Sequence, residues 1–473
     1  MTAIEAYPPI IQGGMGVAVS NWVLARATAL RGQLGVVSGT GLDTVLARRL
    51  QDGDASGDMR RAMRAFPIPE VAPEVERTYF RAGGRAPGEP YRLLPLHRIV
   101  PQRAREMLTI LANFVEVHLA KEGHEGPVGV NLLTKVQLPT LASLYGAMLA
   151  GVDYVLMGAG IPREIPGALD RLAGHEPASL TLDIEDQNGD GPRTARLEPT
   201  MFWPAATPPL RRPRFLPIVG SSLLARMLAK KANGRVDGFV VEGPTAGGHN
   251  APPRGQVRYG PRGEPLYGER DVVDLEDLRA LGLPFWVAGG VGSPEALARA
   301  REAGAVGIQV GTLFAFCDES GLDAAYRRGV LEAVSRGDVE VRTDPRASPT
   351  GYPFKVVQWD GGSGAVRERI CDMGYLRTPY VRPDGGIGFR CASEPVETYV
   401  AKGGERDDTV GRQCLCNALL ANVGLGQVRA GGRREPPLLT AGDDLPAIAR
   451  FLKGRTQYTA GEVIDYLLGE AAA

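Results

Sequence analysis

Residues 284–304 read PFWVAGGVGSPEALARAREAG and predict one strand-to-helix unit. An apolar run enters a glycine-rich turn, after which Ser293 has the position of a helix N-cap and Pro294 the first helical position. Gly304 then ends the helix. Bare glycine amides beside a helix N-terminus form a site for an anion. The spacing is not G-x-G-x-x-G, so the turn disfavours a dinucleotide-binding fold.

The same alternation of strand and helix extends to both sides of this unit. Apolar strands with glycine-rich or polar exits are predicted at residues 8–12, 35–40, 128–133, 153–160, 216–222, 284–288 and 306–312, and a further strand ends at Val240 and Val241. Asn21 and Ser221 or Ser222 have the positions of helix N-caps after two of these strands. Strands that alternate with helices are typical of a parallel α/β protein. We therefore predict a (β/α)8 TIM barrel, assigned to residues 1–342.

Two stretches interrupt the alternation. Residues 41–126 are charged and rich in Pro and Gly, with one helix predicted at about 102–121. We expect this insertion, which follows the second strand, above the barrel mouth as a lid or an oligomer contact. Residues 175–214 contain two alternating segments joined by a turn-rich sequence, which predicts an extra β-hairpin outside the barrel.

Residues 343–473 lack the βα pattern, and we expect them to form a packed C-terminal appendage. Its last helix is predicted after Thr459, which has capping-box spacing to Glu462. Four of the five cysteines fall in this segment: Cys371, Cys391, Cys414 and Cys416. Soft thiolates in a loop-rich segment suit zinc or an iron-sulfur cluster. Because the spacing is not C-x-x-C, buried structural thiols remain the alternative.

Composition restricts the partners. Lys+Arg and Asp+Glu both count 54, so no net charge favours nucleic acid or an anionic membrane, and a small-molecule ligand is expected. The N-terminus does not resemble a secretory signal, and there is no uninterrupted apolar run of about 18 residues. These features predict a soluble, cytoplasmic protein. The oligomeric state stays open, with a homo-oligomer among the possibilities.

The sixth strand ends in the sequence VVEGPTAGGHN, residues 240–250. Gly247 and Gly248 allow a sharp turn beneath His249, which places one imidazole at a strand mouth. The carboxyl ends of the strands are where this architecture carries its chemistry. The alternative is that His249 only caps its own turn.

Two further strand exits carry candidate binding residues. Asn131 is a polar residue in the apolar strand 128–133, and its amide needs partners from a bound heterocycle or from neighbouring loop carbonyls. Met15 lies between glycines where the first strand stops, so a flat ligand could contact the bare backbone there. Met15 could equally fill the core, the commoner role of methionine.

Together the strand ends IIQGGMG, VGVNLL, MGAG, VEGPTAGGHN, VAGGVGSP and IQVGT resemble the FMN-dependent nitronate monooxygenases, formerly called 2-nitropropane dioxygenases, and the related flavin enoyl-acyl-carrier-protein reductases. The resemblance covers residues 8–316. It implies that FMN is the cofactor and that His249 is the catalytic residue. The cofactor-binding positions that it implies are Gly14, Met15 (through its backbone amide), Asn131, Gly248, Gln309 and, at the phosphate, Gly289, Gly290, Gly311 and Thr312.

The resemblance implies oxidation of alkyl nitronates with O2 as the reaction. NAD(P)H-dependent reduction of an enoyl thioester is the alternative, and a flavin-binding assembly or regulatory protein with weak turnover is a second. Thr245 stands where family members often carry Glu, and the insertion at 41–126 is longer than in compact members. Because both departures lie near the expected substrate, FMN binding is the firmer expectation.

Overall fold

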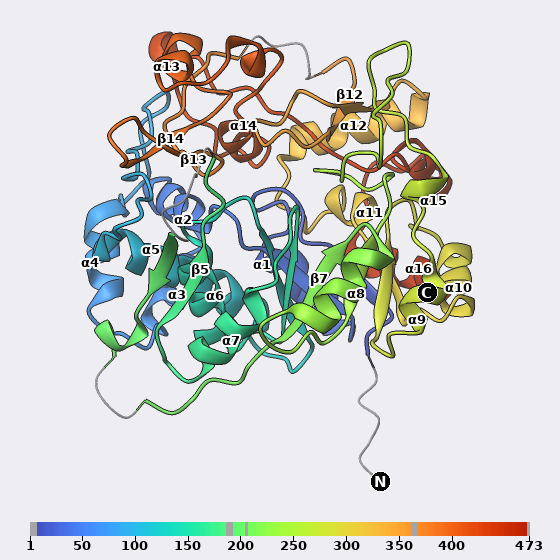
Figure 1. Cartoon of the computed structure of the whole chain (residues 1–473), viewed down its shortest axis with the longest axis horizontal. Helices are drawn as coiled ribbons and strands as arrows, with labels where there is room; N and C mark the ends of the chain where they lie inside the picture. The colour runs from blue at the N-terminus through green and yellow to red at the C-terminus, as the bar shows by residue number, and fades with distance from the viewer. Residues whose placement is uncertain (1–6, 186–192, 204–206, 362–366, 471–473) are drawn as a thin grey trace.

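Eight parallel strands close a barrel in the computed structural model, which describes residues 7–185, 193–203, 207–361 and 367–470 (Figure 1). The strands, in the spatial order β1-β10-β9-β8-β7-β4-β3-β2, are β1 (Ile10–Gln12), β2 (Leu34–Ser38), β3 (Val128–Leu133), β4 (Tyr154–Gly158), β7 (Arg214–Val219), β8 (Phe239–Glu242), β9 (Phe285–Ala288) and β10 (Gly307–Val310). The predicted (β/α)8 barrel is therefore confirmed. Alternate strand residues, among them Ile11, Val36 and Trp286, fill its interior.

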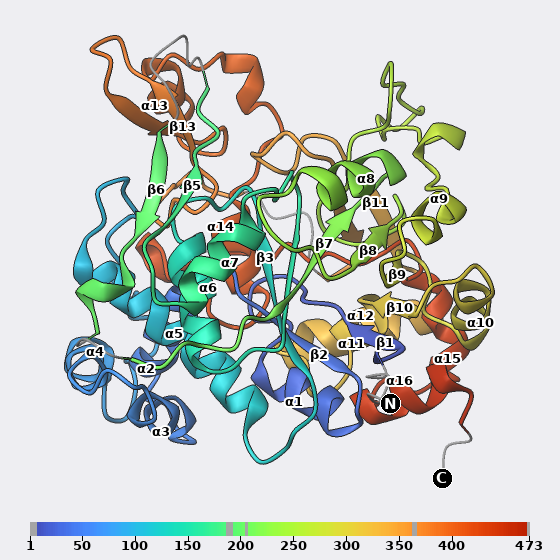
Figure 2. The same cartoon turned by 60° about the horizontal axis from the view of Figure 1, so that its bottom comes forward.

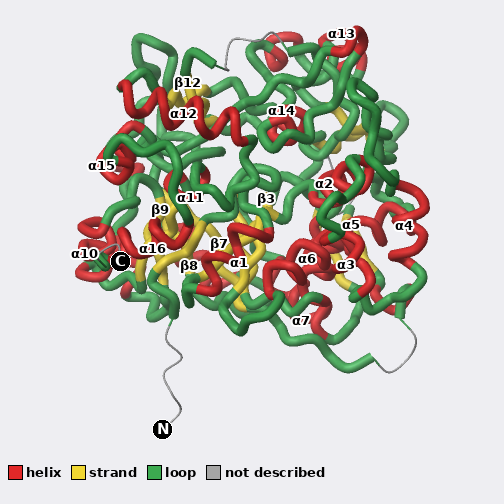
Figure 3. The backbone as a smooth tube through the Cα atoms, turned by 180° about the vertical axis from the view of Figure 1, so that it is seen from behind, coloured by secondary structure: helices red, strands yellow, loops and turns green. Residues whose placement is uncertain are grey.

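Helices surround these strands (Figure 3). They are α1 (Trp22–Leu30), α5 (Arg103–Lys121), α6 (Thr140–Leu149), α7 (Ile165–Ala173), α8 (Ser222–Lys231), α9 (Leu275–Arg279), α10 (Pro294–Glu302), α11 (Thr312–Ala315) and α12 (Ala324–Arg336). The predicted N-caps are present: Asn21 accepts from Leu24 N at 2.9 Å, and Ser221 accepts from Leu224 N at 3.0 Å. Ser293 accepts from Ala296 N at 3.2 Å, so α10 begins where the sequence predicts.

The insertion contains three helices that the sequence did not reveal, α2 (Leu42–Gln51), α3 (Asp58–Arg64) and α4 (Val71–Tyr79), which contact α5. Gly41 and Gly57, with φ of 72° and 76°, precede α2 and α3, and neither helix has a side-chain cap. The usual Ser, Thr, Asp or Asn start signal is therefore missing. A role for the insertion as a lid or an interface stays a prediction.

The predicted hairpin is confirmed as the antiparallel pair β5 (Ala178–Thr181) and β6 (Thr194–Leu197), separate from the barrel sheet. The predicted turn at 186–192 lies outside the described residues. Two further antiparallel pairs occur in the tail: β11 (Glu340–Asp344) with β12 (Phe354–Gln358), and β13 (Thr378–Val381) with β14 (Ile387–Arg390). The predicted boundary between residues 342 and 343 falls within β11, and the division into domains stays a prediction.

The C-terminal appendage lies over one end of the barrel and then returns along its side (Figures 1 and 2). Its helices are α13 (Val396–Ala401), α14 (Leu415–Ala421), α15 (Ala449–Leu452) and α16 (Ala460–Leu468), and its 3-10 turns are η3 (Arg406–Thr409), η4 (Ala430–Gly432) and η5 (Pro446–Ile448). Two further 3-10 turns, η1 (Pro199–Met201) and η2 (Glu269–Asp271), lie outside the appendage. The α16 helix starts with the predicted capping box of Thr459 and Glu462 and contacts α1 and α10. Within the described ranges, no helix combines the length and apolar character needed to cross a bilayer.

Candidate functional site

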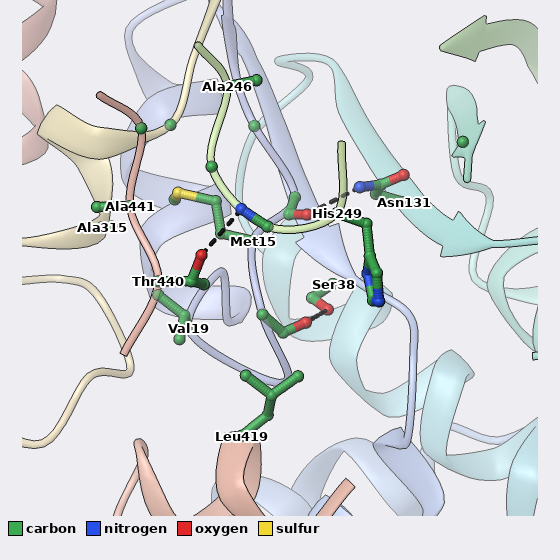
Figure 4. Close-up of a pocket in the computed structure, with 18 of the residues that line it drawn as sticks. Met15, Val19, Ser38, Asn131, Ala246, His249, Ala315, Leu419, Thr440 and Ala441 are labelled. Atoms are coloured by element: carbon green, nitrogen blue, oxygen red, sulfur yellow. Dashed lines mark hydrogen bonds between the residues drawn. The ribbon is translucent and has the colours of Figure 1, made fainter. Parts of the chain in front are cut away.

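A cavity of about 270 Å³ lies at the carboxyl ends of the barrel strands, where this fold places its chemistry (Figure 4). The appendage contributes part of its wall through α14 and residues 439–444. The barrel residues singled out in the sequence all line this one cavity: Gly14, Met15, Asn131, Gly248, His249, Gly289, Gly290, Gln309, Gly311 and Thr312.

The His249 imidazole is held from two sides by the appendage. Its Nε2 lies 2.7 Å from Oγ of Ser348, which is fully buried, and its ring packs edge-to-face on Phe354 with a centroid distance of 4.9 Å. Gly248 has a φ of 78°, and its N–H donates to Oγ1 of Thr440 at 2.9 Å. Burial lowers the pKa of His249 to about 4. The imidazole is therefore neutral near pH 7 and can act as a base.

Asn131 and Gly14 form one side of the cavity. The Asn131 amide donates from Nδ2 to the carbonyl of Gly14 at 2.8 Å. A Cβ on residue 14 would come within 2.4 Å of the Asn131 Cβ, so only glycine fits here. Oδ1 of Asn131 and Oε1 of Gln309 are buried without a hydrogen-bond partner in the described structure. Both residues line the cavity, where a bound ligand would supply the missing donors.

The Met15 amide differs from what the family resemblance implies. Its N–H, expected to face a flavin ring, donates to Oγ of Ser20 at 2.9 Å. The Met15 side chain nevertheless lines the cavity, with its sulfur beside Gly311. In this conformation the Met15 side chain is therefore available to contact a ligand, while its backbone N–H is used in a hydrogen bond within its own loop.

The predicted anion site is formed by a glycine turn and two short loops. Gly289 and Gly290 have φ of 94° and 65°, conformations that favour glycine, and the turn leads into the nine-residue helix α10. Thr312 donates from Oγ1 to Asp444 at 2.6 Å and accepts from Gly442 N at 3.1 Å. Burial raises the pKa of Asp444, which makes its carboxyl easier to protonate. Among the described residues lining the cavity, none is Lys or Arg, so a phosphate would be held by backbone N–H groups, and by the Thr312 hydroxyl only if it turns away from Asp444.

Sequence reasoning missed the contributions of the appendage. Ser348 and Thr440 each bond to the 247–250 loop, and Asp444 lies beside Thr312. The run TAGDD at residues 440–444, with a glycine between polar side chains, is the one local signal that pointed to a binding loop. Ser348 gave no signal, because its role depends on a contact across 99 residues of sequence.

The four cysteines of the appendage lie close enough together to shift one another's pKa, both within the pairs Cys371/Cys391 and Cys414/Cys416 and between these pairs. A hydrogen bond shared with Cys391 raises the pKa of Cys371 and lowers that of Cys391. The same kind of contact lowers the pKa of Cys414 to about 7 and raises that of Cys416. Over the described parts of the chain, no group of three or more His, Cys, Asp or Glu side chains is arranged to hold a metal ion. The predicted zinc or iron-sulfur site therefore finds no support, because such a site needs its ligands around one centre.

The fold and the cavity at the strand ends define an α/β barrel with its site at the usual face. Residues 214–345 match the family model described as nitronate monooxygenase. A curated nitronate monooxygenase from Pseudomonas aeruginosa is 36% identical over 94 residues, which is 20% of this chain and 25% of the relative. Both sequence matches are therefore partial, and this chain spans about a quarter of the length of that curated protein.

Solved structures show a distant likeness over the whole chain. FabK from Thermotoga maritima has a TM-score of 0.48 and 17% identity, covering 98% of this chain and 93% of that one. Nitroalkane oxidase from Streptomyces ansochromogenes has a TM-score of 0.45 and 16% identity, covering 98% and 95%. Likeness at this level does not transfer an activity.

Proposed function

We propose that this chain is an FMN-dependent oxidoreductase that oxidises alkyl nitronates with O2. The observation that carries the proposal is the pair of orphaned acceptors, Asn131 Oδ1 and Gln309 Oε1, on the wall of a cavity that also contains a helix N-terminus preceded by glycines. A flavin ring has an N–H to donate to such acceptors, and its phosphate suits such a turn. The residues present therefore fit the cofactor.

Within this proposal, FMN supplies the electron acceptor when it is bound. Asn131 and Gln309 would hold its ring. Gly289, Gly290, Gly311 and Thr312 would hold its phosphate through backbone amides and one hydroxyl. One helix N-terminus with one glycine turn suits a single phosphate, so FMN fits better than FAD.

The His249 imidazole would face the substrate as a neutral group. Its lowered pKa favours a role as base or hydrogen-bond acceptor over a role as a positive partner for nitro oxygens. Ser348 and Phe354, both in the appendage, hold the ring in one orientation.

The choice of nitronates rests on the family match. Residues 214–345 include the His249 loop, the 289–292 turn and the last barrel strand, so the matched segment contains both the proposed catalytic and the proposed phosphate-binding positions. Reduction of an enoyl thioester with NAD(P)H would use the same cavity, and no feature of the described structure favours it.

Mixing the flavin-loaded protein anaerobically with propyl-2-nitronate or with NADPH distinguishes nitronate oxidation from enoyl reduction. Propyl-2-nitronate is expected to bleach the flavin absorbance rapidly, while NADPH leaves it unchanged on the same time scale. Rapid bleaching by NADPH alone would reverse the proposal in favour of enoyl reduction.

A further inference from the structure

A second cavity of about 230 Å³ adjoins the first. Ala159, Ile218, Glu242 and His249 line both cavities, so the two spaces meet at the carboxyl ends of β4, β7 and β8. Two of these four shared residues can bind or release a proton. The sequence drew attention to His249, whereas Glu242 received no role.

The second cavity suits an apolar chain. Three of its polar side chains are already bonded to the protein: Arg254 donates to the carbonyl of Gly220, Tyr267 donates to the carbonyl of Ala251 at 3.0 Å, and Asp271 accepts from Arg254 N at 2.8 Å. The remaining wall includes Ile161, Leu224 and Pro252. Ile161 is 56% exposed, so an apolar surface extends to solvent. A ligand entering here meets these apolar residues, and the polar groups without a hydrogen-bond partner include Oδ1 of Asn250 on the wall and the Glu242 carboxyl at the junction.

The Glu242 carboxyl is the unbonded group at that junction. It has no hydrogen bond or ion pair to any described residue. Burial alone raises its pKa to about 8, whereas burial alone lowers the pKa of His249 to about 4. Near pH 7 the carboxyl therefore keeps a proton that it can donate, and the imidazole is neutral.

Other titratable or charged groups face the two cavities without contributing to the pKa of Glu242. They are Asp444, Tyr375 and Cys416 in the first cavity and Arg254, Tyr267 and Asp271 in the second. Because none of these groups shifts the pKa of the Glu242 carboxyl, burial at the junction is the cause of its raised pKa.

We propose that the substrate enters through the second cavity with an apolar chain, and that the Glu242 carboxyl donates a hydrogen bond to its anionic head opposite His249. This inference rests on the proposed function and adds a second residue that contacts the substrate. An alkyl nitronate has this form, with two oxygens sharing one negative charge on a short chain. An ionised carboxylate at the junction would repel such a head, so binding requires the protonated form.

Titration calorimetry with butanoate tests this role without any turnover, because a carboxylate has the same planar, anionic head as a nitronate. In the wild-type protein, affinity is expected to fall about tenfold for each pH unit above about 8. Glu242→Gln keeps an N–H donor and removes the proton, so its affinity should not change with pH. Glu242→Ala lacks a donor and should bind about 10- to 100-fold more weakly at neutral pH.

A second pair of variants tests the entry route of the substrate separately from the binding of its anionic head. Leu224→Trp fills part of the second cavity and should weaken binding of hexanoate, whereas Leu223→Trp, on the same helix with residue 223 72% exposed, should not. Equal hexanoate binding in both variants would overturn entry through this cavity.

Each failure has its own signature. Wild-type affinity for butanoate that is independent of pH, or an equal pH slope in Glu242→Gln, would overturn the role of Glu242. Butanoate binding with the expected pH dependence, but without oxidation of propyl-2-nitronate, would instead reject the proposed reaction and leave the anion site in place.

Discussion

Nε2 of His249 lies 2.7 Å from Oγ of Ser348, which joins the barrel's proposed catalytic loop to the C-terminal appendage. The backbone strengthens the connection, since Lys355 N donates to the carbonyl of Gly248 and Asn250 N donates to the carbonyl of Pro353, both at 2.9 Å. The orientation of the imidazole is therefore a property of the whole chain.

Ser348→Ala tests this connection. The variant also loses the bonds of this hydroxyl to Thr350, but the loss of the bond to His249, about 1 kcal/mol, should lower kcat about 3- to 10-fold while FMN content stays the same. Steady-state kinetics with propyl-2-nitronate measures it. Ser335→Ala, which removes a hydroxyl bonded to the carbonyl of Leu331 on α12, is the matched control. Equal rates in both variants would show that Ser348 does not position His249.

His249→Asn should keep the flavin spectrum and lose about 100-fold or more in kcat, because the residue is placed for reaction. The wild-type pH profile gives a second test. A base must be deprotonated, so kcat/KM should hold from neutral pH downward and decline only as the pH falls through about 4. An acidic limb near the ordinary histidine value of about 6.5 would contradict the neutral, buried imidazole.

Asp444 should make FMN binding depend on pH. Its protonated form can donate to a phosphate oxygen, whereas its ionised form repels one, so affinity should rise as the pH falls. The phosphate has its own second pKa of about 6, which affects all variants equally. Asp444→Asn should therefore bind FMN more tightly than wild type at alkaline pH, with a shallower slope. Parallel slopes in fluorescence titrations would place Asp444 away from the phosphate.

Asp43 joins the insertion to the appendage. Its buried carboxylate lies 2.7 Å from Nη1 of Arg105, itself 5% exposed, and accepts from the hydroxyl of Tyr375. Asp43→Ala would leave a buried guanidinium unpaired and should cost about 3–5 kcal/mol of unfolding free energy. Asp170→Ala breaks an ion pair whose carboxylate is 48% exposed and should cost about 1 kcal/mol or less. Urea unfolding with equal losses would show that the Asp43 network adds little.

Local signals predicted the barrel and its side of the cavity. Helix caps such as Asn21 and Ser293 depend on contacts over three residues of sequence. At strand exits such as 289–292, the glycines themselves indicate the backbone conformation of the turn. The same reasoning failed where a structure depends on distant partners. Ser348 meets His249 only after folding, and the Met15 amide bonds to Ser20 within a loop whose path the sequence did not reveal. The cysteines come near one another, as expected, but among the described residues the irregular fold of the appendage does not arrange three or more of them to hold a metal ion.

Cofactor extraction tests the central claim most directly. We expect the purified chain to be yellow and to release FMN, with no FAD, on denaturation. If the protein is purified without its cofactor, added FMN should bind and riboflavin, which lacks the phosphate, should bind more weakly. Colourless protein that does not bind added FMN would contradict the account of the cavity as a flavin site.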